Sequence, residues 1–450
     1  MGYNLFMLRS ASFVLALVFA AATASAAPSQ TTPSQQEVVR QSAQLLLTTF
    51  YRKLTPATVI DAEREGLLAY LRAHGAASAK LPPVPPAIEP SAVGDAAIAQ
   101  IDAAVSTGKI TEDDAVAKAV KAMASSARDR YTTYFTRDEY RAFDEILDPT
   151  KLSGIGVLMD VDPATKYLRA FFVVPDTPAD RGGLKSGDDI RAIDGHSTLN
   201  FTVAQGRKFL LGSSGTPVRL TIGHGDETPS DTTLTRAEIQ PPTVYFSMLP
   251  DEVAYIYLAA FGDATPKEFR TAIARSETAG ARAYVLDLRN DGGGRVGTAL
   301  SVSSEFIASG PIVSIESNGG EIDTFEADNT AIAPKPLAVL VNAYSASASE
   351  ITAAALQESG TGVLVGTKTF GKGVVQSVTK FGDGSAIKIT TGRYYTPLHH
   401  DINGAGIQPN IVVDENKSAV FGTPGKDAQL TKALQVLSAA LADRTPATKP

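Results

Sequence analysis

The sequence predicts a multi-domain α/β protein of 450 residues. Three consecutive patterns predict it. Residues 37–146 show mostly helical spacing of apolar side chains, 150–239 show short strands between Gly-containing turns, and 253–413 alternate strands with helices. At about 150 residues per domain, the chain is long enough for about three domains.

An export signal is predicted at the start of the chain, over residues 1–26. Arg9 is the sole charge there, an apolar run covers Phe13–Ala22, and small residues end at Ala26. We expect cleavage after Ala26 and a periplasmic or extracellular protein. The alternative is a short uncleaved anchor, although the run is shorter than the roughly 20 residues that span a bilayer.

The next region, 27–147, is predicted to be a helical domain. Pro56 opens a helix, and Ala-rich helical patterns cover about 95–106 and 111–127. Between the helix that Pro56 opens and the pattern at 95–106, the segment Leu81–Pro86 is too rich in proline for regular structure. It predicts a linker or strap.

Strands and turns dominate 148–239, where Asp194-Gly195 is a hairpin signal. The region 240–414 then alternates elements, and 415–450 holds a C-terminal helix and tail. The strands predicted in 240–414 are Val253–Leu258, Tyr284–Leu288, Leu337–Val341, Val363–Val365, Val374–Thr379 and Ala386–Thr391, and the helices are 266–278, 297–307 and 349–359.

Composition excludes several classes of function. The chain has 41 Lys and Arg against 48 Asp and Glu, a net charge of −7, which argues against a nucleic-acid partner. It has no cysteine, and its five histidines form no H-E-x-x-H pair, so thiol chemistry and zincin-type hydrolysis are not expected. We expect no metal and no cofactor.

A serine stands where a predicted strand leads into a helix. Ser347-x-x-Glu350 is a capping box, and Ser347 as a simple helix cap is one interpretation. The other is a nucleophile, because the free N–H groups and the positive end of a helix can stabilise an oxyanion.

Lys372 is the better candidate for the base that such a serine needs. His399-His400 lies in a segment predicted to be at the surface, whereas Lys372 lies between glycines that permit a tight turn. A lysine of pKa about 10.4 must lose solvation to act as a base near neutral pH. Gln376, four positions on, can hold the amine without adding charge. Alternatively, Lys372 is a solvated loop residue like Lys368.

A glycine-rich turn, Asp287-Leu288-Arg289-Asn290-Asp291-Gly292-Gly293-Gly294, follows a buried strand and precedes a helix. Its glycines could bring backbone N–H groups close to a substrate oxygen. A plain tight turn is the alternative, and a phosphate cradle is poorly supported because no G-K-[ST] follows.

Together and in this order, these segments resemble the carboxyl-terminal processing peptidases, or tail-specific proteases. That family shows an S-A-S-A-S-E helix start, a lysine 25 positions after the central serine (372 − 347) and a glutamine four positions later. Its D-L-R-N-x-x-G-G turn matches 287–294. The segment Tyr131–Phe135 resembles the junction before the family's PDZ domain, with Arg130 where proline is usual.

The resemblance implies an exported serine endopeptidase with a crotonase-like α/β core over 240–414 and a PDZ domain over 148–239. It implies Ser347 as nucleophile, Lys372 as base and Gln376 as its orienting partner. The oxyanion would be held by the backbone N–H groups of Ala348 and Gly293.

The resemblance also implies substrates and partners. The PDZ loop Gly154-Ile155-Gly156 would offer N–H groups to the terminal carboxylate of a peptide, so substrates would be proteins or peptides with apolar C-terminal tails. The N-terminal helices are a candidate surface for a homodimer. Two alternatives stay open: an inactive scaffold that binds peptides through its PDZ domain, and an acyl-CoA-type enzyme on the related fold.

Overall fold

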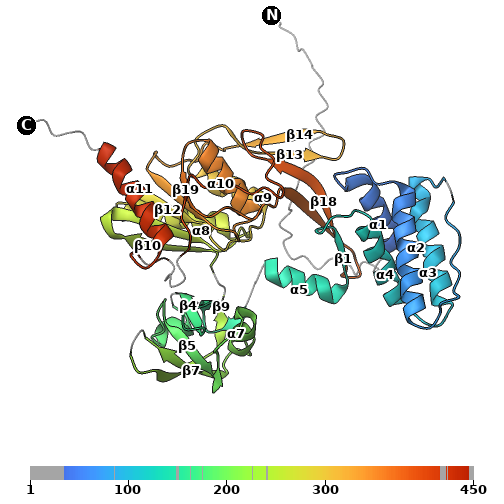
Figure 1. The fold of residues 1–450 in the computed structure, drawn as a ribbon, viewed down its shortest axis with the longest axis horizontal. Coiled ribbons are helices and arrows are strands. Elements are labelled where there is room, and N and C mark those ends of the chain that lie inside the picture. The colour runs from blue at the N-terminus through green and yellow to red at the C-terminus, as the bar shows by residue number, and fades with distance from the viewer. Residues whose placement is uncertain are drawn as a thin grey trace, which may run out of the picture.

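The computed structural model describes residues 35–85, 87–147, 152–162, 164–174, 176–224, 227–239, 242–415, 422 and 424–444. The predicted signal peptide lies outside these residues. A helical region, a small β-rich region and an α/β core follow one another along the chain (Figure 1). Within the described residues, no helix is both long enough and apolar enough to cross a membrane.

The helical region packs four helices around one apolar core. Thr55 caps α2 by accepting the Thr58 N–H, and Pro56 occupies its first turn. Gly66 of α2 allows α4 to approach closely, because a Cβ there would lie 2.5 Å from the Ala122 Cβ. The elements are α1 (Gln35–Thr49), α2 (Pro56–Ala73), η1 (Pro90–Ala92), α3 (Val93–Val105) and α4 (Glu112–Ser125).

A five-stranded sheet connects this region to the core. Its longest strand, β18, pairs antiparallel with β1, β13 and β17. Ile387 and Ile389 of β18 are buried in the core of the helical region. The elements are β1 (Thr133–Phe135), α5 (Arg137–Leu147), β13 (Pro311–Ser317), β14 (Ile322–Glu326), β17 (Val374–Lys380) and β18 (Ala386–Tyr395).

In the β-rich region, the sheet order is β3-β4-β5-β7-β8, with β6 beside β5. Among the described residues β3 pairs only with β4, so it is an edge strand, and α7 packs near it. The elements are β2 (Leu152–Gly154), β3 (Val157–Val161), β4 (Leu168–Val173), α6 (Pro178–Arg181), β5 (Asp189–Ile193), β6 (His196–Ser197), α7 (Val203–Leu210), β7 (Pro217–Gly223), β8 (Ser230–Thr235) and β9 (Ala237–Ile239).

The α/β core is built on a six-stranded sheet of order β10-β11-β12-β15-β16-β19, parallel except at β10. Buried strands of this kind need apolar residues on both faces. The elements are β10 (Val244–Leu249), η2 (Pro250–Glu252), β11 (Val253–Leu258), α8 (Thr265–Thr278), β12 (Ala283–Asp287), α9 (Val296–Ser304), β15 (Leu337–Val341), α10 (Ala348–Glu358), β16 (Val363–Gly366), β19 (Ile411–Val412) and α11 (Ala428–Arg444).

Different elements pack on the two faces of this sheet. Residues such as Ile256 pack with α8, α9 and α10, whereas alternate residues pack with α11 and with the β-rich region. The rings of Phe171 and Tyr257 are 5.4 Å apart, and those of Phe172 and Tyr245 are 4.1 Å apart. The β-rich region therefore docks beside α11 on the face away from α10.

Candidate active site

Ser347 lies directly before α10, at the carboxyl end of the buried strand β15. Its backbone has φ 59° and ψ −115°, a conformation that is unfavourable for a residue with a Cβ. The residue is half-buried, while Ala348 beside it is fully buried. The turn thus holds a hydroxyl next to the first N–H groups of an 11-residue helix.

Glu350 joins the serine turn to the lysine loop. One oxygen, Oε2, accepts the backbone N–H of Ser347 at 3.0 Å and that of Lys372 at 2.8 Å. Oε1 accepts from the Thr369 hydroxyl at 2.6 Å and from the Gly371 N–H at 2.7 Å. The carboxylate is completely buried, and these four donors replace its water.

Tyr394 of β18 bridges the same two residues from their carbonyl side. Its hydroxyl lies 3.2 Å from the Ser347 carbonyl oxygen and also donates to the Lys372 carbonyl oxygen. The Glu350 carboxylate and the Tyr394 hydroxyl therefore bring the backbones of Ser347 and Lys372 together. The sequence pattern predicts Glu350 only as the partner of Ser347 in a capping box, and no local signal marks Tyr394 as a site residue.

Lys372 is half-buried, and burial lowers the pKa of its amine, as does the charge of Lys388. Its Nζ lies 5.1 Å from the centroid of the Tyr131 ring. Within the described part of the chain, no hydrogen bond or ion pair holds this Nζ. No local sequence signal links Tyr131 to the site, because the two segments are far apart in the chain.

Gln376 and His400 make their contacts with residues other than Ser347 and Lys372. The Gln376 side-chain amide donates to the Val374 carbonyl at 3.2 Å, within its own strand. His400 Nδ1 lies 2.8 Å from Glu358 Oε1, and the His400 side chain is 67% exposed. This environment offers no link from His400 to Ser347 among the described residues.

The glycine-rich turn packs directly against the serine. A Cβ on Gly293 would lie 2.9 Å from the Ser347 Cβ and 2.8 Å from the Ala348 nitrogen. The Gly293 N–H donates to Asp291 Oδ1 at 2.8 Å. Asp291 is fully buried, burial raises its pKa well above the ordinary range, and its carbonyl accepts the Ala346 N–H at 3.0 Å.

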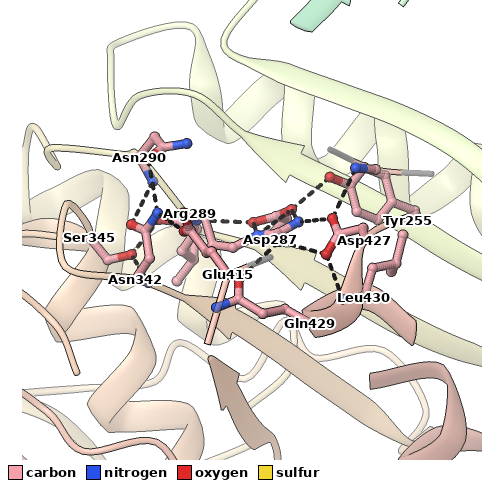
Figure 2. Close-up of polar contacts among 12 residues, drawn as sticks. Tyr255, Asp287, Arg289, Asn290, Asn342, Ser345, Glu415, Asp427, Gln429 and Leu430 are labelled. Atoms are coloured by element: carbon pink, nitrogen blue, oxygen red, sulfur yellow. Dashed lines mark hydrogen bonds and ion pairs between the residues drawn. The ribbon is translucent and has the colours of Figure 1, made fainter. Parts of the chain in front are cut away.

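Figure 2 shows a buried polar network behind this turn. Arg289 is 1% exposed and donates to Asp287 and Asp427, with its NH2 group 2.6 and 2.8 Å from their oxygens. Asp427 also caps α11 by accepting the Leu430 N–H at 3.0 Å. The C-terminal helix is thereby tied to the strand end from which the glycine-rich turn starts.

A second contact in Figure 2 joins the turn to the serine segment. Asn342, at the end of β15, accepts the Asn290 N–H at 3.0 Å and donates to the Asn290 side chain at 2.9 Å. Ser345 donates to the Leu288 carbonyl at 2.7 Å. The two segments therefore hold a fixed position relative to each other.

The expected peptide-binding loop precedes the edge strand β3. The carbonyls of Ile155 and Gly156 accept from Ala179 at 2.8 Å and Val174 at 2.9 Å. Gly156 has φ 84°, and a Cβ there would lie 2.3 Å from the Thr177 side chain. Ile155 is buried in the core of the β-rich region, so this loop is held rigidly at the start of an edge strand.

Comparisons with known proteins agree with this architecture. Residues 252–413 match the model of peptidase family S41, and residues 173–222 match a PDZ domain. The carboxyl-terminal-processing protease of Picosynechococcus sp. is 33% identical over 338 residues, covering 73% of this chain and 80% of that protein. The one from Synechocystis sp. is 34% identical over 331 residues, covering 72% and 77%.

A solved structure, the photosystem II D1 C-terminal processing protease, has a similar fold. It matches with a TM-score of 0.50 at 23% identity, over 90% of this chain and 97% of that one. The predicted fold class, a helical region, a PDZ domain and a protease core, is confirmed.

These findings define a serine peptidase that carries a PDZ domain. The chain belongs to the carboxyl-terminal processing proteases of peptidase family S41.

Proposed function

We propose that this protease cleaves peptide bonds with a Ser347–Lys372 dyad. The observation that carries the proposal is the double bridge between the two residues: Glu350 Oε2 accepts both of their N–H groups, and the Tyr394 hydroxyl lies between their carbonyls. The lowered pKa of Lys372 supports its use as a base.

In the proposed reaction, the acyl group of the substrate is transferred first to Ser347 and then to water. Lys372 takes the proton of the Ser347 hydroxyl as the oxygen attacks the scissile carbonyl carbon. The proton passes to the leaving amine as the C–N bond breaks, which leaves an ester on Ser347. Lys372 then deprotonates the water that hydrolyses the ester. Gln376 orients the Lys372 amine. To do so, the Gln376 side chain must break its hydrogen bond to the Val374 carbonyl.

The oxyanion is stabilised by the N–H groups of Ala348 and Gly293. Ala348 begins α10, and Gly293 lies against it. Because the Gly293 N–H donates to Asp291 in the structure, we propose that this peptide turns toward the oxyanion when substrate binds.

Substrate recognition is assigned to the PDZ domain. The loop Gly154-Ile155-Gly156 would bind the terminal carboxylate of a protein, and its apolar tail would add to the edge of β3 as a further strand. The fixed loop and the single pairing of β3 among the described residues support this assignment.

We further propose export of the chain after cleavage at Ala26, and a homodimer through the N-terminal helices. The domain limits proposed are 1–26 for the signal peptide, 27–147, 148–239, 240–414 and 415–450. The charge of Arg9, the apolar run Phe13–Ala22 and the small residues that end at Ala26 support export.

Degradation of a protein with an apolar C-terminal tail tests the proposal. Ser347→Ala and Lys372→Ala should each abolish cleavage, measured by mass spectrometry of the products. The controls are Ser359→Ala and Lys368→Ala, which change exposed neighbours of the same types. If the Ser347 variant cleaves like the unaltered protein, the dyad is wrong. If the unaltered protein binds the tail without cleaving it, the inactive scaffold is favoured.

A further inference from the structure

Tyr131 belongs to the segment that leaves the helical region, yet its ring lies at the amine of Lys372. The ring centroid is 5.1 Å from Lys372 Nζ and 4.8 Å from the Arg130 guanidinium carbon. The Tyr131 hydroxyl is buried and has no hydrogen-bond partner among the described residues. The hydroxyl therefore does not explain the placement of this side chain, whereas the ring does.

The backbone around Tyr131 is fixed to the catalytic sheet. Asp129 accepts the Tyr131 N–H at 3.2 Å and the Thr132 hydroxyl at 2.9 Å. Thr132 accepts the Thr390 N–H of β18 at 3.1 Å, and Thr133 pairs with Lys388. These contacts hold the backbone of Tyr131 in a fixed position beside β18.

We propose that Tyr131 is a positioning residue for the Ser347–Lys372 reaction: its ring covers the amine, excludes water from it and so keeps it in the neutral form. This inference rests on the proposed function and deepens it. It makes the segment between α4 and β1 a part of the active site.

Two effects of the ring oppose each other. A cation–π contact favours the ammonium, by about one pKa unit or less when partly exposed. Exclusion of water favours the neutral amine, and in fully buried lysines it shifts the pKa by up to about 3–5 units. Exclusion is the larger effect, in agreement with the lowered pKa of Lys372, whose first cause is burial.

Other groups also act on this amine, and a test must leave them in place. Positive neighbours lower the pKa of Lys372 and negative ones raise it. They are Lys388 on β18, Arg130 and Asp129 beside Tyr131, and Glu350 on α10. Substitutions at Tyr131 change none of these charges.

The test is the pH dependence of kcat/KM for a tailed peptide substrate. Tyr131→Ala exposes the amine to water, so the acid limb should move up by about one pH unit or more. Activity at pH 7 then falls about tenfold or more and returns as the pH rises past the new midpoint. Tyr131→Phe keeps the ring and should keep the midpoint.

Tyr51→Ala is the matched control, because Tyr51 lies at the same junction and its N–H donates to the Thr390 carbonyl. It should leave the midpoint in place. If Tyr131→Ala does not fold, Tyr131→Gln, of more similar volume, should show the same upward shift. An unchanged midpoint in the Ala or Gln variant, or an equal shift in Tyr131→Phe, would overturn the inference. Retained cleavage in Lys372→Ala would instead reject the dyad.

Discussion

At residue scale, the site concentrates conformational strain where the chemistry is proposed. Ser347 is held at φ 59°, and a non-glycine residue in such a region costs about 1–3 kcal/mol. The cost is offset by bonds to both of its backbone groups: Glu350 accepts its N–H, and its carbonyl accepts the Ile351 N–H at 2.9 Å. A strained residue held this firmly is typical of functional turns.

The glycine-rich turn gives a prediction with an internal control. Gly293→Ala should abolish activity, because its Cβ would lie 2.5 Å from the Ala346 carbonyl oxygen and its φ is 93°. Gly292→Ala should be tolerated, since a Cβ there meets nothing within 4 Å. Cleavage assays and thermal melts of both variants check this. Equal activity of the two variants would mean that Gly293 does not pack against the reacting serine.

At element scale, α11 is expected to support the active-site turn. Asp427→Ala removes one partner of the buried Arg289, and breaking such a pair typically costs about 3–5 kcal/mol. The variant should lose stability in chemical denaturation and lose cleavage activity together. Asp443→Ala, on the exposed end of the same helix, should change neither. Full activity of Asp427→Ala would separate α11 from the site.

A second prediction at this scale concerns α2. Glu63 is fully buried, its carboxylate has no hydrogen-bond partner among the described residues, and burial raises its pKa to about 9. In the unfolded chain the pKa of Glu63 returns to about 4.5. The folded state therefore binds the extra proton, so the contribution of Glu63 to stability is fully present below pH 4.5 and is lost as the pH rises to about 9.

The loss at pH 7 should be about 3 kcal/mol, from about 1.36 kcal/mol for each pH unit above 4.5. Glu63→Gln should remove this slope from denaturation curves of the helical region. Glu65→Gln, an exposed neighbour, should keep it. A pH-independent stability of the unaltered protein between pH 5 and about 8 would contradict the burial of a neutral Glu63.

At the scale of the whole molecule, the sequence predicted most of the α/β core, because long apolar strands and their following helices have clear periodicity. It missed β10, β13, β14 and β19. All five residues of β14 are exposed, so no apolar alternation marks it. The serine and lysine segments were predictable from their strand-to-helix and glycine signals, which are local.

The contacts made between distant segments were not predictable in the same way. Tyr131 reaches Lys372 only through the pairing of β1 with β18, and Arg289 meets Asp427 only when α11 packs on the sheet. Register and packing decide such contacts, and no local pattern in the sequence reveals either. The domain limits likewise stay a prediction.

The PDZ domain docks on the core face that also receives α11. We expect amidation of the substrate's C-terminus to weaken binding about tenfold or more, because the loop loses a charged acceptor for its N–H groups. Calorimetry of Ser347→Ala with the acid and amide peptides measures this without cleavage. Equal affinity for the two peptides would remove the loop 154–156 from recognition.

The most direct measurement is covalent labelling with a fluorophosphonate, which reacts with activated serines, followed by peptide mass spectrometry. The unaltered protein should carry a single adduct on the peptide that contains Ser347, and Lys372→Ala should carry none. An adduct on another serine, or equal labelling of Ser347 without Lys372, would contradict the dyad.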